Sequence, residues 1–430
     1  MKILFVYPRF NRHAEDHPEL RQWVPMNEYL GSPSLGIAAI AAMTPAGVEL
    51  EFRDDRVTPA DRPTDADLVA FSFFTPAATR AFELAHYFRA QGKTLVCGGI
   101  FPTMMPGECA PHFDAVVVGE GEGLWRTLLD DFAHQRLRPR YEEAASLCLD
   151  DLPPPRLDLY FAAERGSFQP DDYPLQLSRG CPLTCQACVL PTSMTKTLRQ
   201  VPLDRVFAQL RSMVAAKKRA CLTEDTSWFA GRQTHRLRDF FNRIIEEGLV
   251  AEVSYIGISM PMLLTASPEL LALARRAGVS MFYLVGGFDP ITMKAFTGKD
   301  QKALARAHLA IEKAHAAGIE PYTSFLIGND DDDEGTADRM LEFAERARIA
   351  KAEFAIFTPY PGTPAWRRLE AEGRILDKRW ARYNDSNVVF QPAKMSVRAL
   401  EDSYLRLWRE FYAPKAHYRD LPQAARTIQF

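Results

Sequence analysis

The stretch Leu177–Cys188, LSRGCPLTCQAC, places three cysteines within eight residues, at Cys181, Cys185 and Cys188. Their spacing is C-x3-C-x2-C, and it follows an apolar, strand-like run and an Arg-Gly pair. Three neighbouring thiolates can bind three irons of a cubane iron–sulfur cluster, since soft thiolate ligands suit iron–sulfur chemistry. No fourth cysteine lies nearby in the sequence, so the fourth iron would be open to a substrate or cofactor.

Two other interpretations of these cysteines are open. A structural zinc site needs four tetrahedral ligands and usually a second C-x2-C or H-x3–5-H pair, which the sequence lacks. Thr184, Gln186 and Thr192 are poor ligands, and the next cysteine, Cys221, lies in an apolar run. The other interpretation is three buried or incidental cysteines. We favour the cluster.

At these residues the chain resembles the radical S-adenosylmethionine (SAM) superfamily. In that family the C-x3-C-x2-C loop holds a [4Fe–4S] cluster whose open iron chelates the amino and carboxylate groups of SAM. The resemblance implies that Cys181, Cys185 and Cys188 bind such a cluster and that the chain binds SAM. One departure lies inside the motif. Most relatives have an aromatic residue before the last cysteine, where it packs against adenine, and this chain has Ala187.

Length and composition limit the number of domains and the class of protein. A chain of 430 residues exceeds what a single core usually serves, so we expect two domains plus an appendage. Its 47% hydrophobic and 25% charged residues are typical of soluble proteins, and a net charge of −3 gives no support for nucleic-acid binding. We find no apolar run long enough for a membrane span and no signal peptide. Seven cysteines, three of them clustered, do not form a disulfide framework, so we expect a reducing, cytoplasmic location. We also expect a monomer.

The first third of the chain alternates short apolar strands with helices. The predicted strands cover residues 2–7, 48–53, 67–72, 94–97 and 114–118. Helical patterns cover residues 35–43, 76–90 and 124–133. This alternation predicts an α/β domain over residues 1–140, with a doubly wound, flavodoxin-like Rossmann parallel sheet. Ligands bind such sheets at the carboxyl ends of the strands.

The segments that follow these strands contain polar residues and glycines. Gly98-Gly99 alone would indicate only a tight turn. Together, however, residues 70–122 resemble the cobalamin-binding domain that precedes many radical SAM enzymes: a Ser-containing loop, a Gly-Gly pair about 26 residues later and a final V-x-G-E-x-E. Pro33-Ser34-Leu35-Gly36 matches the P-x-L-G element of that family. The resemblance implies that cobalamin contacts Pro8, Arg9, Ser72, Phe73, Phe74, Thr75, Gly98, Gly99, Gly119 and Glu120.

No histidine motif accompanies this domain. Many cobalamin proteins carry D-x-H-x-x-G, whose histidine coordinates cobalt, and this chain lacks it. His13 and His17 do not have that spacing, and we predict that they are solvated loop residues. Radical SAM relatives often lack the histidine, so we expect cobalamin bound without histidine ligation. The alternative is a domain that has lost cobalamin.

A second series of strands and helices fills residues 173–370. Before it, residues 141–172 contain three consecutive prolines, 153–155, and indicate an extended linker. Strands are predicted at 175–178, 220–223, 253–258, 281–286, 321–327 and 353–357, with helices at 202–217, 234–247, 267–277, 300–317 and 336–349. The spacing predicts a partial (β/α)6 TIM-like barrel with its chemistry at the C-terminal face. That is also the core of the radical SAM family.

The resemblance places SAM contacts at the ends of these strands. They are Glu224, Asp225, Ser259, Gly287, Asp289, Gly328, Thr358 and Pro359. A carboxylate after the second strand suits the SAM ammonium group, although a solvated loop carboxylate is the alternative. Residues 358–364, TPYPGTP, match the T-P-x-P-G-T-P of the cobalamin-dependent subgroup. We assign no catalytic acid or base, because packing is the simpler role for Tyr283, Cys221, His235 and His315.

The C-terminal region, residues 371–430, is predicted to be small, mostly helical and to cap the barrel. Its W-x-x-Y…VVF-x-P…M-S pattern resembles the tail of the same subgroup, which packs beside the barrel mouth. The helix expected at 397–412 carries an apolar stripe that we interpret as core: Leu400, Tyr404, Leu407, Trp408 and Phe411.

The resemblance covers nearly the whole chain, which is identified as a member of the cobalamin-dependent (class B) radical SAM enzymes. It implies reductive SAM cleavage, with methylcobalamin methylating an unactivated carbon or phosphorus centre of a small natural-product or lipid-like substrate. An external one-electron reductant, such as flavodoxin or ferredoxin, would be needed. One alternative is ring formation or oxidative rearrangement without methyl transfer. Another is an iron–sulfur electron-transfer protein without SAM chemistry.

Overall fold

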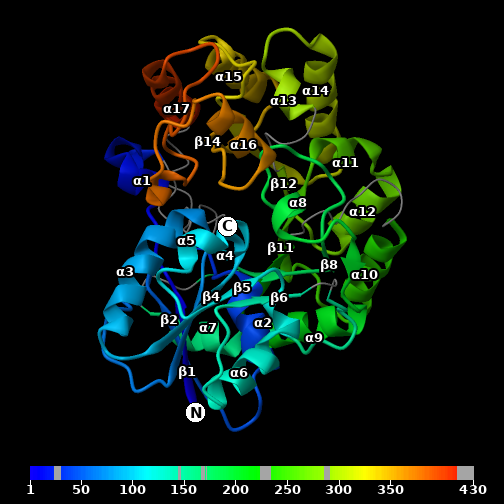
Figure 1. The fold of residues 1–430 in the computed structure, drawn as a ribbon. Helices are drawn as coiled ribbons and strands as arrows, with labels where there is room; N and C mark the ends of the chain where they lie inside the picture. The colour runs from blue at the N-terminus through cyan, green and yellow to red at the C-terminus, as the bar shows by residue number, and fades with distance from the viewer. Residues whose placement is uncertain are drawn as a thin grey trace.

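Two six-stranded parallel sheets organise the chain (Figure 1). The computed structural model describes residues 1–23, 31–143, 147–165, 170, 172–222, 234–284 and 291–413. The two sheets and their helices confirm the predicted fold class, a Rossmann-type sheet followed by a partial barrel.

The first sheet has the order β2-β1-β3-β4-β5-β6. Its strands are β1 (Lys2–Tyr7), β2 (Glu49–Asp54), β3 (Leu68–Ser72), β4 (Thr94–Gly98), β5 (Ala115–Val118) and β6 (Arg140–Glu142). The chain order reverses between β1 and β3, which is where a doubly wound sheet binds ligands. β1 is apolar after Lys2, from Ile3 to Tyr7, because both of its faces are covered. Successive residues point to opposite faces, so Phe5 and Val6 belong to separate hydrophobic cores.

Helices cover both faces of this sheet. α2 (Leu35–Met43) and α6 (Trp125–Ala133) pack on the face of Phe5, and α3 (Ala78–Arg89) packs on the opposite face. Because α2 is apolar almost throughout, it buries residues on more than one side.

The predicted linker contains two further elements of the first domain. β6 pairs in parallel with β5, and α7 (Asp158–Ala163) contacts β2. The Tyr160 hydroxyl of α7 donates to the Ser34 carbonyl (2.7 Å) and accepts from the Ala38 amide (3.0 Å). The prediction of an extended linker was wrong for these parts. The edge strand β6 is RYE, whose two charged residues hide any apolar pattern.

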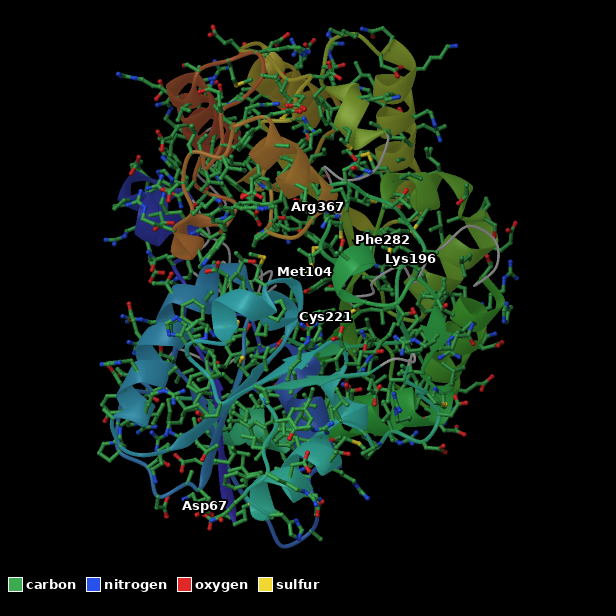
Figure 2. The ribbon with its side chains drawn as sticks, viewed as in Figure 1. Asp67, Met104, Lys196, Cys221, Phe282 and Arg367 are labelled. Carbon is green, nitrogen blue, oxygen red and sulfur yellow. The ribbon has the colours of Figure 1, made fainter. Side chains whose placement is uncertain are left out.

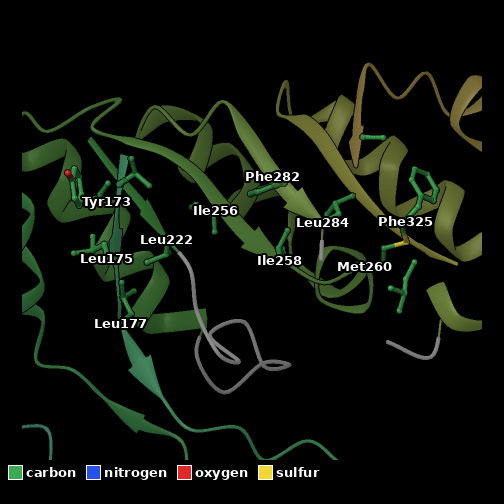
Figure 3. Close-up of a cluster of buried hydrophobic side chains, with 14 of the residues drawn as sticks. Tyr173, Leu175, Leu177, Leu222, Ile256, Ile258, Met260, Phe282, Leu284 and Phe325 are labelled. Carbon is green, nitrogen blue, oxygen red and sulfur yellow. The ribbon is translucent and has the colours of Figure 1, made fainter. Parts of the chain in front are cut away.

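The second sheet has the order β14-β13-β12-β11-β10-β7. Its strands are β7 (Asp172–Leu175), β10 (Arg219–Leu222), β11 (Val253–Ile258), β12 (Met281–Leu284), β13 (Glu320–Ile327) and β14 (Lys351–Ile356). Its helices include α9 (Leu203–Ala215), α10 (Thr234–Glu246), α12 (Pro268–Arg276), α14 (Gln301–Ala316) and α15 (Thr336–Arg346). Figure 3 shows the apolar side chains that neighbouring strands contribute to this core, among them Leu222, Ile256, Phe282 and Leu284.

The opposite side of the second sheet is more polar. Cys221, Tyr255, Met281 and Tyr322 form a separate small buried cluster, and Tyr283 packs against it. Alternation along the strands therefore separates a helix-covered apolar face from a barrel interior that contains hydroxyl groups.

The C-terminal region packs beside the edge strand of the barrel. α17 (Val397–Tyr412) buries its predicted apolar stripe, which confirms that interpretation. The Trp408 ring lies 5.4 Å from the ring of Phe354 in β14. Phe354 belongs to the main apolar core, so this helix covers the outer face of β14. Leu400, near its start, lies against Gly328 at the carboxyl end of β13.

Candidate functional site

A short antiparallel pair of strands closes the loop that carries the three cysteines. β8 (Ser178–Arg179) pairs with β9 (Arg199–Gln200), and residues 180–198 between them are named the cluster loop. The Cys181 amide donates to the Thr195 carbonyl (3.1 Å). Gly180 has a φ of +96°, and a Cβ there would lie 2.2 Å from the Thr197 carbonyl oxygen, so no larger residue fits.

The cysteines sit in this loop at different depths. Cys181 is buried, and Cys185 and Cys188 are half-buried. No three His, Cys, Asp or Glu side chains of the described residues are grouped so that they could hold one metal ion. In a cubane cluster each thiolate binds a different iron, so its ligands need not converge on one ion.

The TPYPGTP turn packs against the cluster loop. α16 (Pro364–Ala371) begins in this turn, and its Ala365 amide donates to the Gln186 carbonyl (2.9 Å). Ala187, next in sequence, is buried in the main core. On its other side the turn meets the first domain, since Met104 of α4 (Ile100–Met104) lies against Gly362. Figure 2 shows Met104 facing the barrel side, where Arg367 donates to the Gly362 carbonyl (2.6 Å).

A cavity of about 610 Å³ lies at the carboxyl ends of the strands of the first sheet. This volume is in the range of small-molecule sites. Its apolar part lies between α2 and the sheet and includes Phe5, Ile37, Ile40, Val117 and Trp125. Its other wall comes from the barrel domain: Pro174, Gln176, Arg179, Ser193 and Met194. The Ser193 hydroxyl is buried without a hydrogen-bond partner in the described residues.

Seven of the ten predicted cobalamin contacts line this cavity. They are Ser72, Phe73, Phe74, Gly98, Gly99, Gly119 and Glu120. The other three do not line it. Pro8 is buried, Arg9 is exposed with its amide bonded to Asp55, and Thr75 is buried at the start of η2 (Thr75–Ala77).

Gly99 shows why this turn requires glycine. Its φ is +103°, and a Cβ would lie 2.9 Å from the Phe73 carbonyl oxygen and 3.0 Å from the Ser72 hydroxyl. The close contact brings the loops after β3 and β4 together at the edge of the cavity. An apolar slot bordered by glycine turns at the carboxyl ends of a parallel sheet suits a large planar cofactor, so the residues present fit a corrinoid.

Sequence reasoning recognised the P-x-L-G element at the start of α2 but predicted no cobalamin contact on α2 or in the barrel. The apolar character of α2 on several sides was a usable signal, since a helix of this composition must be covered on more than one face. Nothing in the sequence placed Gln176 or Ser193 beside the first sheet.

Four of the predicted SAM contacts lie at the ends of described strands. Ser259 follows β11 and precedes α11 (Met260–Thr265), Gly328 follows β13, and Thr358 and Pro359 follow β14. Because β13 and β14 pair up to Ile327 and Ile356, Gly328 and the TPYPGTP turn start side by side. Glu224, Asp225, Gly287 and Asp289 lie outside the described residues.

A buried carboxylate supports the turn after β13. Asp332 accepts hydrogen bonds from the amides of Gly328 and Asn329, both at 2.8 Å. Only 2% of Asp332 is exposed, and burial raises its pKa to about 6 despite these bonds.

A second carboxylate supports the turn after β14. Tyr360 donates to Asp385 (2.9 Å), and the Asp385 carbonyl accepts from the Ile356 amide (2.7 Å). Burial again raises the pKa of this aspartate, to about 6. Both turns at this face thus rest on acids that ionise less readily than usual.

Of the four residues considered as acid or base, two face the barrel interior. The Tyr283 hydroxyl donates to Glu353 of β14, whose pKa is raised by burial. Cys221 is buried, which raises the pKa of its thiol to about 12. His315 bonds to the Ala347 carbonyl (3.2 Å), and His235 is exposed on α10.

The prediction that His13 and His17 are solvated was wrong. Both are buried, because α1 (His13–Asp16) and η1 (Pro18–Gln22) pack against the C-terminal region. His13 donates to the Asn384 carbonyl (3.0 Å) and accepts from the Tyr404 hydroxyl (2.8 Å). Burial lowers the pKa of His13 to about 3, so the ring is neutral. Neither histidine lines the cavity.

Two family models and several full-length relatives match this chain. Residues 30–129 match the B12 binding domain family, and residues 363–429 match a domain of unknown function. The chain is 26% identical to bacteriochlorophyllide d C-12(1)-methyltransferase from Chlorobaculum tepidum, over 90% of this chain and 84% of that one. It is 24% identical to hopanoid C-2 methylase from Rhodopseudomonas palustris, over 90% and 73%.

Two further similarities bear on the fold and on the reaction. The anaerobic magnesium-protoporphyrin IX monomethyl ester cyclase from Cereibacter sphaeroides is 24% identical, over 97% of this chain and 72% of that one. The structure of the radical SAM methyltransferase TsrM from Kitasatospora setae, with cobalamin and a [4Fe–4S] cluster bound, superimposes with a TM-score of 0.67. It covers 97% of this chain and 90% of TsrM at 15% identity, and so shows a shared fold. No helix within the described ranges is long and apolar enough to span a membrane.

Proposed function

We infer that this chain, a member of the cobalamin-dependent radical SAM enzymes, methylates an unactivated carbon or phosphorus centre of a small natural-product or lipid-like substrate. One observation carries the proposal: a single cavity is lined both by the glycine turns of the B12-type domain and by the segment around the three cysteines. Similarity to two named methyltransferases over 90% of the chain supports methyl transfer as the outcome.

The residues divide this work between them. Cys181, Cys185 and Cys188 would hold a [4Fe–4S] cluster, and the cavity would hold the corrinoid without a histidine ligand. When bound, the reduced cluster supplies an electron for SAM cleavage and methylcobalamin supplies the methyl group. The turns at Gly328 and Thr358 would bind SAM, with the predicted contacts Ser259, Pro359, Glu224, Asp225, Gly287 and Asp289.

The chain's own contribution is to orient these groups and exclude water. Buried tyrosines fill part of the barrel interior and so exclude water from it. Asp332 and Asp385 stabilise the turns after β13 and β14 through hydrogen bonds. An external one-electron reductant such as flavodoxin or ferredoxin would serve a monomeric enzyme.

A second candidate function keeps the same cofactors. The similarity to the monomethyl ester cyclase over 97% of the chain favours ring formation or oxidative rearrangement without methyl transfer. The two functions differ in whether a methyl group leaves SAM for the corrinoid.

The test is an anaerobic incubation of reconstituted protein with hydroxocobalamin, dithionite and CD3-labelled SAM, followed by mass spectrometry. Methyl transfer predicts CD3 label in the corrinoid together with S-adenosylhomocysteine, as well as 5′-deoxyadenosine. Deoxyadenosine without labelled corrinoid would overturn the methyltransferase in favour of the second candidate. Absence of both products would leave an electron-transfer protein.

A further inference from the structure

Two arginines hold both ends of the cluster loop against the B12-type domain. Arg179 in β8 and Arg199 in β9 are paired residues of the strands that close this loop. Their partners are Glu120 and Glu122, which follow β5 and line the cavity. We name these four residues the arginine–glutamate clamp.

The geometry of the clamp is close and its side chains are largely buried. Arg179 Nη1 lies 2.6 Å from Glu122 Oε1 and 3.3 Å from Glu120 Oε1. Arg199 Nη1 lies 2.6 Å from Glu120 Oε2 and also donates to the Leu147 carbonyl (2.7 Å). No clamp side chain is more than 13% exposed.

Stability alone is a weak reason for such a network. Removing four charges from water is costly, and well-packed apolar residues often replace buried ion pairs without loss of stability. What the network does provide is a fixed geometry, because a shared carboxylate restricts where two guanidinium groups can lie. Glu120 binds one arginine through each of its oxygens, so it ties β8 and β9 to one turn.

Both ends of the clamp belong to a cofactor site. On one side, the turn of Glu120 and Glu122 forms part of the cavity wall, as does Arg179. On the other side, Arg179 precedes Gly180 and Cys181 directly, and the Cys181 amide is fixed to Thr195. A shift of the turn after β5 is therefore transmitted to the first cluster ligand through one side chain.

We propose that Arg179 and Arg199 are positioning residues that link the two cofactor sites, so that cluster assembly strengthens corrinoid binding and corrinoid binding strengthens the cluster. This inference rests on the proposed function for the identity of the two cofactors. Linkage requires the two effects to be equal in size, and couplings of this kind usually change affinity about 5- to 150-fold.

The experiment measures the Kd of hydroxocobalamin for the full chain, anaerobically, with the cluster reconstituted and after its removal by a chelator. Wild-type protein is expected to bind at least about 5-fold more tightly with the cluster present. Glu122→Gln keeps the shape of the side chain but removes its charge, and should reduce this ratio to below about 2-fold.

A matched control is Glu164→Gln. Glu164 pairs with Lys218 at 2.8 Å with similar burial, 12% and 14% exposed, but it lines no part of the cavity. This variant should keep the wild-type ratio. Glu120→Gln provides a second test that leaves the 2.6 Å pair of Arg179 and Glu122 in place, and should give an intermediate ratio.

The outcomes separate the coupling from the proposed function. A wild-type ratio of 1, or a wild-type ratio retained in both Glu120→Gln and Glu122→Gln, overturns the coupling and leaves the methyltransferase proposal intact. Wild-type protein that binds no hydroxocobalamin overturns both.

Discussion

Replacing Gly99 with alanine should destabilise the first domain strongly. At φ +103°, an L-residue adopts a backbone conformation that costs about 1–3 kcal/mol. The new Cβ would lie 2.9 Å from the Phe73 carbonyl oxygen, and relieving such overpacking costs typically about 1–3 kcal/mol more. Alanine also lowers the conformational entropy of the unfolded chain, which offsets about 0.4–1 kcal/mol of this loss. The net loss is then about 2–5 kcal/mol.

The neighbouring glycine provides the control. A Cβ at Gly98 would meet only Val117, at 3.6 Å, which is an ordinary contact, so Gly98→Ala should unfold within about 2 °C of wild type. Gly99→Ala should lower the unfolding midpoint by roughly 5–15 °C. Circular dichroism of the cofactor-free proteins measures both. Equal midpoints for Gly99→Ala and wild type, or equal losses for the two variants, would refute the argument from backbone strain and close approach.

Three other variants test separate parts of the molecule. Asp332 has a folded-state pKa of about 6, above its unfolded value, so its contribution to stability is present below pH 4 and lost as pH rises through 6. The unfolding free energy of Asp332→Asn, measured in urea relative to wild type, should therefore rise by up to about 3 kcal/mol between pH 4 and pH 7. A difference that does not depend on pH would contradict this. Cys185→Ala should lose most of the iron bound per chain after reconstitution, whereas Cys148→Ala, an exposed cysteine outside the cluster loop, should keep it. Asp16→Ala removes the carboxylate oxygen that accepts from the side-chain amides of Asn384 (2.6 Å) and Asn387 (2.7 Å), and should cost about 1–3 kcal/mol of unfolding free energy; a midpoint equal to wild type would exclude this role.

Local patterns predicted most of the fold. Strands such as β1 and β11 are buried on both sides and read as apolar runs, so their bounds agree with prediction to within a residue. β6 was missed because an edge strand of three residues has no such run. β7 was predicted three residues too late, since the apolar pattern continues past Leu175, where the chain leaves the sheet toward β8.

The burial of His13 and His17 could not be predicted from their neighbours. The segment around them is polar and short, as a solvated loop would be. What buries them are Asn384, Ser386 and Tyr404, about 370 to 390 positions later in the chain. Such contacts depend on how two domains pack, which no local pattern encodes.

The arginine–glutamate clamp could not be predicted for the same reason, because its contacts join two distant segments of the chain. The V-x-G-E-x-E motif and the Arg-Gly-Cys segment were both recognised, and each was assigned to its own cofactor. The contacts between them span 57 to 79 positions and cross the domain boundary. Both oxygens of Glu120 bind arginines, so its carboxylate contributes to the contact between the domains as well as to the cavity wall. Two motifs that resemble separate cofactor sites are therefore joined by the same side chains, and a substitution in either motif should change the affinity of both sites.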